Sequence, residues 1–375
     1  MELMELKERL GTFGEGLQLV HVTASVEGKE VYPLEWAEGL RHLMLCNQES
    51  SLTQIAVGAF HTILVSSKGF VYSYGLNDRM QLGAPAGSRG APWGGAGPCG
   101  GAPEGPWGTP AGAPLPRGPL RGLPQPLKVK ALECGVDHSV LLTEEGFVYS
   151  WGANKYGQCG CAPRQPFVCE PTRLRFQHPR EPKEGARITT IGVGGYHNGA
   201  LDCSGRLYMW GRGSHIYIQG VISDLPLPLW ISLRELLECP PAVSVHCGLG
   251  VTYLLLSDGS LLSFGRSLEG QLGLGASSRA VRTPQKVPLP HKTLNLRCGP
   301  NTTLALTASG QLFQWGTFLL WDEAEEVCVK ARSFKPLAVN LDLLRAPVKA
   351  LGVGWWEAVV LTTEGDLWAW NFFEH

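Results

Sequence analysis

Three histidines stand at one repeated position of the chain, and imidazole is the side chain most suited to proton transfer near neutral pH. Each is the fourth residue of a segment that begins with glycine, and the three are His61, His138 and His197. The matching positions of three further segments hold other side chains, namely Val251, Thr302 and Glu357. Because the histidine recurs only as the segment recurs, we interpret it as a structural side chain that hydrogen-bonds a turn of its own repeat.

The other reactive side chains form no recognisable catalytic set. No serine or cysteine has the spacing to histidine and carboxylate that a nucleophilic enzyme needs, and no phosphate-binding glycine loop of the Walker type occurs. Cys159 and Cys161 are one residue apart, but no second pair or histidine completes a zinc spacing. Acidic residues occur mostly in turns, where solvation accounts for them. We expect no catalytic residue, no metal and no cofactor.

The elements that carry these residues follow a fixed interval. Six segments begin with a glycine, have a second glycine eleven residues later and close at the seventeenth residue, five times on a third glycine. The three landmarks fall at 58, 69 and 75; 135, 146 and 152; 194, 205 and 211; 248, 259 and 265; 299, 310 and 316; and 354, 365 and 371, where the last is Asn371. Landmarks held in register indicate one supersecondary unit used repeatedly.

Each unit has the pattern of a β-hairpin. In the second, Val140 to Leu142 lead into a polar turn that ends at Gly146, and Phe147 to Tyr149 lead out of it to Trp151. Apolar and aromatic runs on both sides of a glycine-containing turn are typical of paired strands. Repeats of about 50 residues built from short strands predict an all-β propeller.

The motifs resemble the repeat of the regulator of chromosome condensation family. The pattern G-x-x-H, L-T-x-x-G, V-Y-x-W-G and G-Q-L-G occurs as Gly58-Ala59-Phe60-His61 with Gln81-Leu82-Gly83, as Gly135-Val136-Asp137-His138 with Gly157-Gln158, and as Gly270-Gln271-Leu272-Gly273 without the histidine. The resemblance implies a seven-bladed β-propeller. We expect one domain over residues 1–375, with a degenerate first blade at about 10–50, clear repeats at about 51–371 and a ring closed by the N-terminal segment.

A Gly/Pro-rich insert interrupts the repeats at residues 84–123. This composition cannot build a core, so we predict a disordered segment between two blades. Two further interpretations stay open: a recruitment element for a proline-binding module, and a sequence variant without function.

Charge, hydropathy and cysteine content indicate which classes of partner and which cellular locations to expect. The net charge is −1 and there is no basic tail, so we expect no nucleic-acid partner. No apolar run is long enough to cross a bilayer, and the first residues do not form a signal peptide. The eleven cysteines show no disulfide framework and are interpreted as reduced thiols. We expect a cytoplasmic and/or nuclear protein without membrane insertion, as a monomer or a subunit of a hetero-complex.

Three functions compete. The favoured one is a protein-interaction scaffold or regulatory adaptor that works with a small GTPase or a trafficking assembly. The resemblance offers a guanine-nucleotide exchange factor as the alternative, because the founding member of the family acts on a small GTPase through one face of its ring and a projecting β-wedge. Asp137 and His138 are then the GTPase-facing residues. The third is a structural remnant of low stability.

Two apolar stretches replace the polar turn that other units carry after their closing glycine. His215, Ile216 and Tyr217 follow Gly211, and Phe318, Leu319 and Trp321 follow Gly316. Exposed apolar side chains at these places would form a partner-binding patch. The alternative is that they pack beneath the connection that follows each of them.

Overall fold

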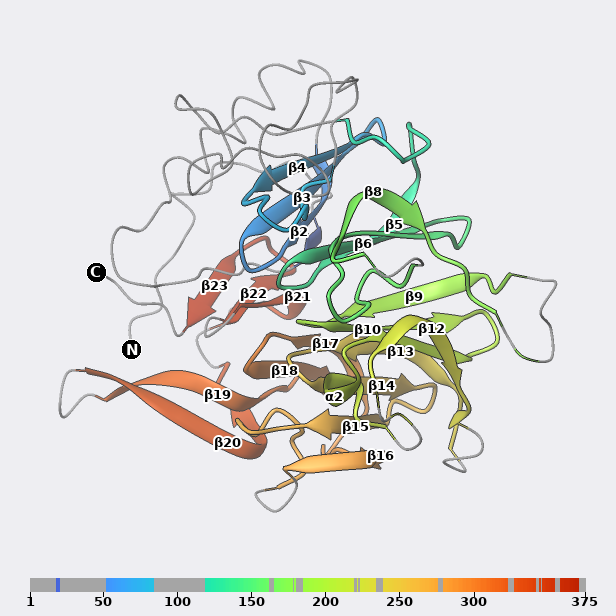
Figure 1. Ribbon diagram of the computed structural model, residues 1–375. Helices are drawn as coiled ribbons and strands as arrows, with labels where there is room; N and C mark the ends of the chain where they lie inside the picture. Colours follow the sequence, from blue (N-terminus) through green and yellow to red (C-terminus); the bar gives the residue numbers. More distant parts are fainter. Residues whose placement is uncertain are drawn as a thin grey trace.

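The computed structural model describes residues 18–20 and 52–370, apart from 84–118, 162–164, 178, 180–184, 219–220, 222, 234–238, 276–278, 323–326, 342–343, 345 and 355–357. These residues form six β-sheets that stand around a central axis as the blades of a propeller (Figure 1). The expected all-β propeller is therefore confirmed.

Blades 1 to 3 follow one another along the chain. Blade 1 contains β1 (Gln18–Val20), β2 (Leu52–Val57), β3 (His61–Ser66) and β4 (Val71–Gly75). Blade 2 contains β5 (Val129–Cys134), β6 (His138–Thr143), β7 (Val148–Ala153) and β8 (Phe167–Arg173). Blade 3 contains β9 (Ile188–Val193), β10 (His197–Asp202), β11 (Leu207–Gly211) and β12 (Leu225–Ile231), with the short helix α2 (Gly213–Ile216) between its last two strands.

Blades 4 to 6 complete the described part. Blade 4 contains β13 (Ala242–Cys247), β14 (Val251–Leu256), β15 (Leu261–Arg266) and β16 (Ala280–Lys286). Blade 5 contains β17 (Thr293–Cys298), β18 (Thr302–Thr307), β19 (Leu312–Asp322) and β20 (Val327–Val339). Blade 6 contains β21 (Val348–Val353), β22 (Ala358–Thr362) and β23 (Leu367–Trp370).

The predicted number of seven blades is wrong for the described part of the chain, which contains six. The degenerate blade expected at about 10–50 lies outside the described residues, except for β1. That strand does not begin a sheet of its own, because it pairs in parallel with β2, the inner strand of blade 1, and also contacts β21, the inner strand of blade 6. Closure of the ring by the N-terminal segment stays a prediction.

The disordered insert expected at 84–123 stays a prediction for residues 84–118, which are not described. Its last residues are ordered, because Leu120 is buried in the core with Val71 and Leu132, and its N–H donates to the carbonyl oxygen of Val71 at 3.1 Å.

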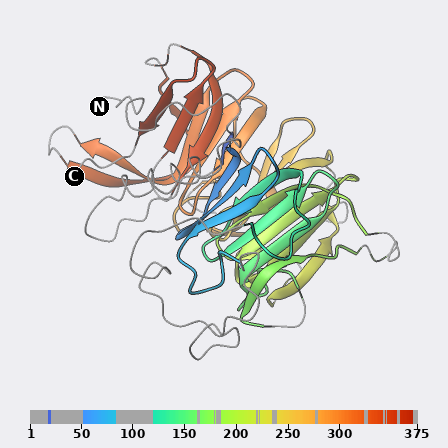
Figure 2. The ribbon, with the colours of Figure 1, turned by 90° about the horizontal axis from the view of Figure 1, so that it is seen from above.

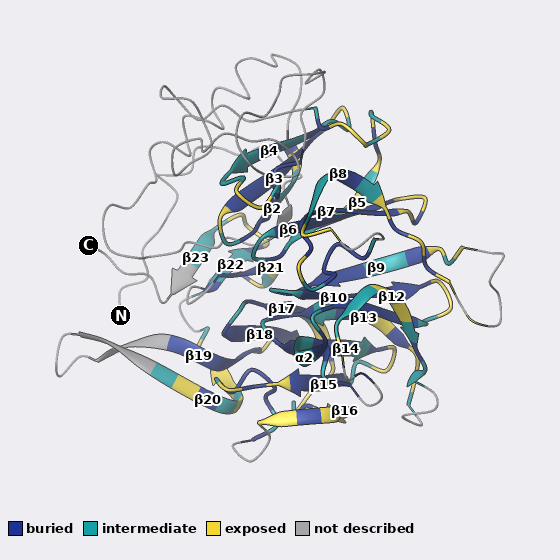
Figure 3. Ribbon diagram, in the orientation of Figure 1, coloured by how far each residue is buried: buried dark blue, intermediate teal, exposed yellow. Residues whose placement is uncertain are grey.

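The repeat landmarks define the central hairpin of each blade. In blade 2, β6 is buried along its whole length and pairs with β7, and the turn between them ends at Gly146 with a φ of 91°. Only glycine adopts this backbone conformation without a steric cost. The hydrophobic core lies between neighbouring blades, where Val140 and Val148 of blade 2 pack with Ile191 and Trp210 of blade 3. Figure 3 shows the buried strands near the axis and the exposed outer strand β16.

The glycine that opens each unit permits blades to approach closely at the axis. A Cβ on Gly135 would lie 2.6 Å from the carbonyl oxygen of Gly194, the opening glycine of the next blade. The same contact relates Gly58 to the carbonyl oxygen of Gly135, also at 2.6 Å. Any larger residue would force the inner strands apart.

A hydrogen-bond pattern joins the blades at two other motifs of the repeat. The indole Nε1 of Trp151 in blade 2 donates to the carbonyl oxygen of Gln81 in blade 1 at 2.9 Å, and Trp210 donates in the same way to Gln158 at 3.0 Å. Trp315 of blade 5 repeats the bond with Gln271 of blade 4 at 2.8 Å. These buried bonds connect the aromatic-glycine motif of one blade with the G-Q-L-G motif of the preceding blade.

Blade 5 departs from the others in the length of its outer strands. Its strands β19 and β20 pair from Leu312 with Val339 to Asp322 with Val327, and they extend away from the ring as a hairpin (Figures 1 and 2). The polar turn of the repeat is replaced here by continued strand pairing.

The cysteines correct one expectation. Seven described cysteines are free, as predicted, whereas Cys169 on β8 is disulfide-bonded. The interpretation of every cysteine as a reduced thiol is therefore wrong for Cys169.

We predict that Trp210→Phe lowers the free energy of unfolding by about 2 kcal/mol, because it removes one buried hydrogen bond and part of a buried ring. Asn198 Nδ2 still donates to the Gln158 carbonyl at 2.8 Å, so no acceptor is orphaned. Urea unfolding followed by fluorescence measures the loss. The control is Trp230→Phe on the outer strand β12, where the side chain is half-buried and we expect a loss below about 1 kcal/mol. Equal losses would contradict the inter-blade role.

Candidate functional site

The loops other than the glycine-ended hairpin turns lie together at one end of the propeller. We define the loop face by the segments that join the first two strands of a blade and by those that follow its third strand. The two kinds of segment meet, since the N–H of Ala153 donates to the carbonyl oxygen of Asp137 at 2.8 Å and the N–H of Arg212 donates to that of Tyr196 at 2.8 Å. The glycine-ended hairpin turns lie at the opposite ends of the strands.

A row of tyrosines and arginines crosses the loop face from blade 2 to blade 4. We call it the Tyr–Arg row, and its members are Tyr156, Tyr196, Arg212, Tyr217, Arg266 and Arg282. The Arg212 guanidinium carbon lies 4.7 Å from the ring centroid of Tyr156 and 5.9 Å from that of Tyr196. Tyr156 and Tyr196 meet edge to face at 5.7 Å. Cations over aromatic faces are held by the ring quadrupole, which keeps the guanidinium groups in place.

Tyr217 forms the second half of this row. Its ring lies beneath two exposed guanidinium groups, with the Arg282 carbon at 4.7 Å and the Arg266 carbon at 4.9 Å from its centroid. The hydrogen bond from Arg282 lowers the pKa of the Tyr217 hydroxyl, and both guanidinium charges act in the same direction. Tyr217 has a φ of 40°, a conformation that non-glycine residues adopt only at a cost.

Helix α2 positions Tyr217 between two blades. It follows β11 of blade 3 and contacts β14 and β15 of blade 4 (Figure 1). Ile216 and Ile218 are fully buried on either side of Tyr217, in the core between these blades. The buried isoleucines fix the backbone, and the half-buried tyrosine between them contacts the exposed Arg266 and Arg282.

The partner-binding residues predicted from the sequence differ in burial. His215 is half-buried and its ring centroid lies 5.5 Å from that of Tyr196, whereas Ile216 and Phe318 are buried. Burial lowers the pKa of His215 to about 4. The side chains of Leu319 and Trp321 lie outside the described residues, although both positions belong to β19. Within these stretches Tyr217 is the residue that joins the Tyr–Arg row.

The two residues predicted to face a GTPase, Asp137 and His138, also differ in burial. Asp137 is half-buried on the loop face, and its pKa is raised by burial and by the charge of Asp78. His138 is fully buried, and its Nε2 lies 2.8 Å from the Asn198 Oδ1 of blade 3. His138 therefore has no surface to offer to a partner.

The repeated histidines connect blades rather than turns of their own blade. His61 Nε2 lies 2.9 Å from Ser139 Oγ of blade 2, and His197 Nε2 lies 2.9 Å from Thr252 Oγ1 of blade 4. Burial lowers the pKa of His61 to about 3 and that of His138 to about 4, and it places the pKa of His197 well below the usual value. These imidazoles are neutral and link neighbouring blades. The expectation that each histidine bonds a turn of its own repeat is therefore wrong, because its Nε2 bonds a side chain of the next blade.

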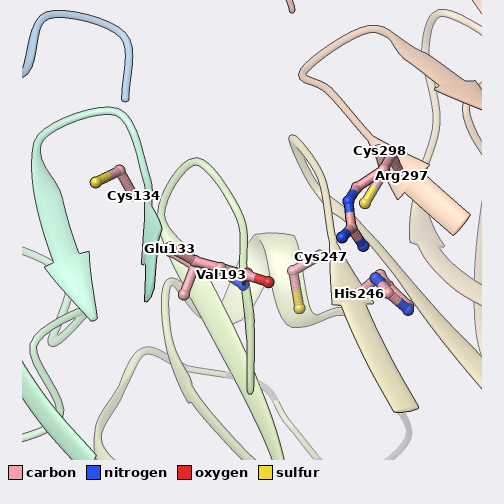
Figure 4. A pocket seen from close by; sticks show the side chains of 7 residues that line it. All are labelled: Glu133, Cys134, Val193, His246, Cys247, Arg297 and Cys298. Atoms are coloured by element: carbon pink, nitrogen blue, oxygen red, sulfur yellow. Dashed lines mark hydrogen bonds between the residues drawn. The ribbon is translucent and has the colours of Figure 1, made fainter. Parts of the chain in front are cut away.

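Three polar side chains of different blades line a cavity of about 20 Å³ in the central channel (Figure 4). Glu133, His246 and Arg297 each stand two residues before the opening glycine of a unit. Glu133 accepts a hydrogen bond from the Val193 N–H at 2.7 Å. Burial raises the pKa of Glu133 to about 7, against the opposing charge of Arg297, and lowers the pKa of His246 to about 3. A cavity of this size has room for about one water molecule, not for a substrate.

The described residues contain no group of three or more His, Cys, Asp or Glu side chains placed to hold a metal ion. Among the same residues, no helix is both long and apolar enough to cross a membrane. The loop face offers cation–π and hydrogen-bonding contacts to a partner.

Sequence reasoning missed most of the Tyr–Arg row. Arg212 and Arg266 each follow the closing glycine of a unit directly, and Tyr196 occupies the third position of its unit, where Phe60 also stands. Both positions could have been singled out as loop positions, but their contacts depend on the packing of blades 2, 3 and 4.

Comparison with known proteins agrees with this architecture. The regulator of chromosome condensation (RCC1) repeat matches residues 145–201 and 258–306, and a second form of the same repeat matches 129–158. The chain carries RCC1 repeats and has the fold of an RCC1-like β-propeller.

Curated relatives resemble this chain over much of its length. The Arabidopsis thaliana ultraviolet-B receptor UVR8 is 27% identical over 85% of this chain and 65% of its own length. The mouse E3 ubiquitin-protein ligase HERC2 is 27% identical over 87% of this chain but only 6% of its own length. The chain thus spans less than two thirds of either relative.

Solved structures show the same fold at lower identity. Human WBSCR16 superposes with a TM-score of 0.66 and 22% identity, covering 86% of this chain and 77% of that chain. Prp20p from Saccharomyces cerevisiae superposes with a TM-score of 0.63 and 19% identity, covering 87% and 73%.

We predict that acidification destabilises the protein between pH 7.5 and 5.0. His61, His138 and His197 have pKa values below those of the unfolded chain, so the unfolded state binds protons first as the pH falls below about 6.5. Each histidine then removes about 2 kcal/mol of stability at pH 5.0. Urea unfolding at the two pH values measures the loss, and His138→Gln, although less stable at pH 7.5, should lose less on acidification.

Glu133 provides a control of opposite sign. Its folded pKa is raised, so its contribution to stability is present below about pH 4.5 and is lost as the pH rises through about 7. Relative to the native chain, Glu133→Gln should therefore become more stable as the pH rises from 5 to 8. A wild-type stability that rises on acidification below pH 6.5 would contradict the neutral, buried state of the three histidines.

Proposed function

We propose that this propeller is a protein-interaction scaffold or regulatory adaptor that binds its partner through the loop face. The observation that carries the proposal is the Tyr–Arg row, in which three tyrosines and three arginines occupy one surface across three blades. Tyrosine and arginine are enriched where proteins bind one another, because they combine a large contact area with directional hydrogen bonds. Rigid β-sheets position these loop residues before any partner arrives.

A small GTPase or a trafficking assembly is the proposed partner class. The structural neighbour Prp20p is described with binding properties to Gsp1p and histones, and the same yeast protein has been solved with Kap60 bound. Those partners belong to the neighbour. They support a use of this ring in protein binding, here as a monomer or as one subunit of a hetero-complex.

The cytoplasm or nucleus is the proposed location. Seven described cysteines are free, as in most proteins of those compartments, and the single bonded residue, Cys169, is the exception. We further propose that the N-terminal segment completes the ring between blades 1 and 6, since β1 contacts the inner strand of each.

To test binding through the loop face, we propose Tyr156→Ala/Tyr217→Ala, with Phe147→Ala as the matched control. Phe147 is 39% exposed beside a hairpin turn at the opposite end and carries the Arg173 guanidinium carbon at 3.5 Å, so it is also an arginine-covered aromatic residue. Quantitative affinity purification from cells should lose the partner set of the wild type with the tyrosine pair and keep it with Phe147→Ala. Retention by all variants, at equal melting temperatures, would refute the proposal.

Guanine-nucleotide exchange on a small GTPase is the second candidate. The projecting hairpin of β19 and β20 favours it, because the resemblance associates such a projection with exchange activity. Asp137 is then the acting residue, since it is on the loop face and His138 is buried.

A fluorescent-nucleotide release assay over a panel of small GTPases tests exchange. Acceleration by the wild type that falls about tenfold or more with Asp137→Asn would support it, since the substitution removes a charged hydrogen-bonding group. No acceleration with any GTPase would leave only the scaffold.

A further inference from the structure

We propose that the Tyr–Arg row binds an acidic segment of a protein partner, whose carboxylates pair with the guanidinium groups of Arg212, Arg266 and Arg282. The inference rests on the proposed function, because it assigns the chemistry of the partner at the same face. The partner segment would lie across blades 2 to 4, and its non-acidic atoms would contact the tyrosine rings.

The three arginines have unused capacity for charge pairing. Among the described residues, none of them has a carboxylate oxygen within 4.0 Å, whereas Arg79, Arg121, Arg206 and Arg332 do. The acidic groups nearby are engaged or recessed: Asp224 accepts the Gly213 N–H at 2.9 Å, and Asp137 is half-buried. The row therefore presents positive charge that the carboxylates of the described residues do not pair with.

The tyrosines fix the guanidinium groups in a geometry that suits carboxylates. A guanidinium has five N–H donors, so Arg266 and Arg282 keep donors beyond those that bond the Tyr217 hydroxyl, and these donors match the two oxygens of a carboxylate. The stacking also reduces the side-chain entropy that is lost on binding, because the arginines are already held. Unpaired arginines on flexible stems would lack this advantage.

The tyrosine between Arg266 and Arg282 supplies a second observation. Tyr217 ends helix α2 in the left-handed conformation, and its backbone N–H donates to the carbonyl oxygen of Gly213 at 2.9 Å. This helix end and the fully buried Ile216 and Ile218 hold the backbone, so the ring is held in place before a partner binds. Tyr217 thus anchors two arginines that come from different strands of blade 4.

The charge distribution favours a protein segment over a nucleic acid. The whole chain has a net charge of −1, so a long polyanion would meet repulsion outside the row. The three guanidinium groups of the row fit a few carboxylates instead. The opposite end of the propeller is mixed in sign, since Arg187 and Lys128 act on Glu145 there.

Fluorescence anisotropy with labelled 15-residue peptides tests the inference. The first probe alternates glutamate with serine, the second replaces every glutamate by glutamine, and the third is a 15-nucleotide oligothymidine. We expect the glutamate peptide to bind at least about tenfold more tightly than the glutamine peptide at low salt, and salt to weaken it. Arg266→Glu/Arg282→Glu should weaken the glutamate peptide by about tenfold or more.

The control reverses two charges at the hairpin-turn end with Arg187→Glu/Lys292→Glu and should change the affinity less than about twofold. Equal affinity for the glutamate and glutamine peptides would overturn the inference, as would oligothymidine binding more tightly than the glutamate peptide. If the tyrosine pair abolishes partner capture in cells while Arg266→Glu/Arg282→Glu does not, the scaffold function stands and the acidic segment is refuted.

Discussion

The propeller depends on one recurring interaction, the hydrogen bond from a buried tryptophan indole to the glutamine carbonyl of the preceding blade. A four-stranded sheet is not stable alone, so each blade must bury its faces against its neighbours. Trp151, Trp210 and Trp315 provide both the apolar area and the directional bond. The imidazoles of His61, His138 and His197 add a second link at the same interfaces.

This constraint decides which residues are available for function. Contacts between blades use the glycine, tryptophan, glutamine and histidine residues of the repeat. The imidazoles lie in the interior and are neutral. Blade 4 shows how the link varies, because Val251 replaces the histidine and the hydroxyl of the neighbouring Tyr253 lies 3.0 Å from Thr303 Oγ1 of blade 5. The loop-face positions whose residue type differs between blades are available to bind a partner. The Tyr–Arg row consists of such residues.

Much of the fold could be predicted from the sequence because the repeat is local. The interval from Gly135 to Gly152 specifies a hairpin whose two strands are adjacent in the chain, and the structure confirms it. The number of blades could not be derived in the same way, because it depends on residues before Leu52 whose spacing departs from the repeat. The long hairpin of β19 and β20 was also missed, since its first strand continues past Gly316, where other units carry a turn.

The candidate site was harder to predict for a physical reason. Arg212 and Tyr156 are 56 positions apart in the chain, and Tyr217 meets Arg282 across two blades, so their contacts arise only from blade packing. The apolar stretch after Gly211 was recognised, but sequence alone could not separate Ile216, which is fully buried, from Tyr217, which is half-buried and contacts two exposed arginines. Alternation along a well-formed strand would have distinguished them, whereas a short helix with a left-handed end does not.

Blade packing leaves the loop face to a partner. Hydrogen–deuterium exchange of the chain with and without the glutamate-serine peptide distinguishes the two ends of the propeller. We expect protection in residues 154–160, 212–218 and 266–273, with no change at the hairpin turns 144–146 and 257–259. Protection confined to those turns, or spread evenly over both ends, would contradict binding at the loop face.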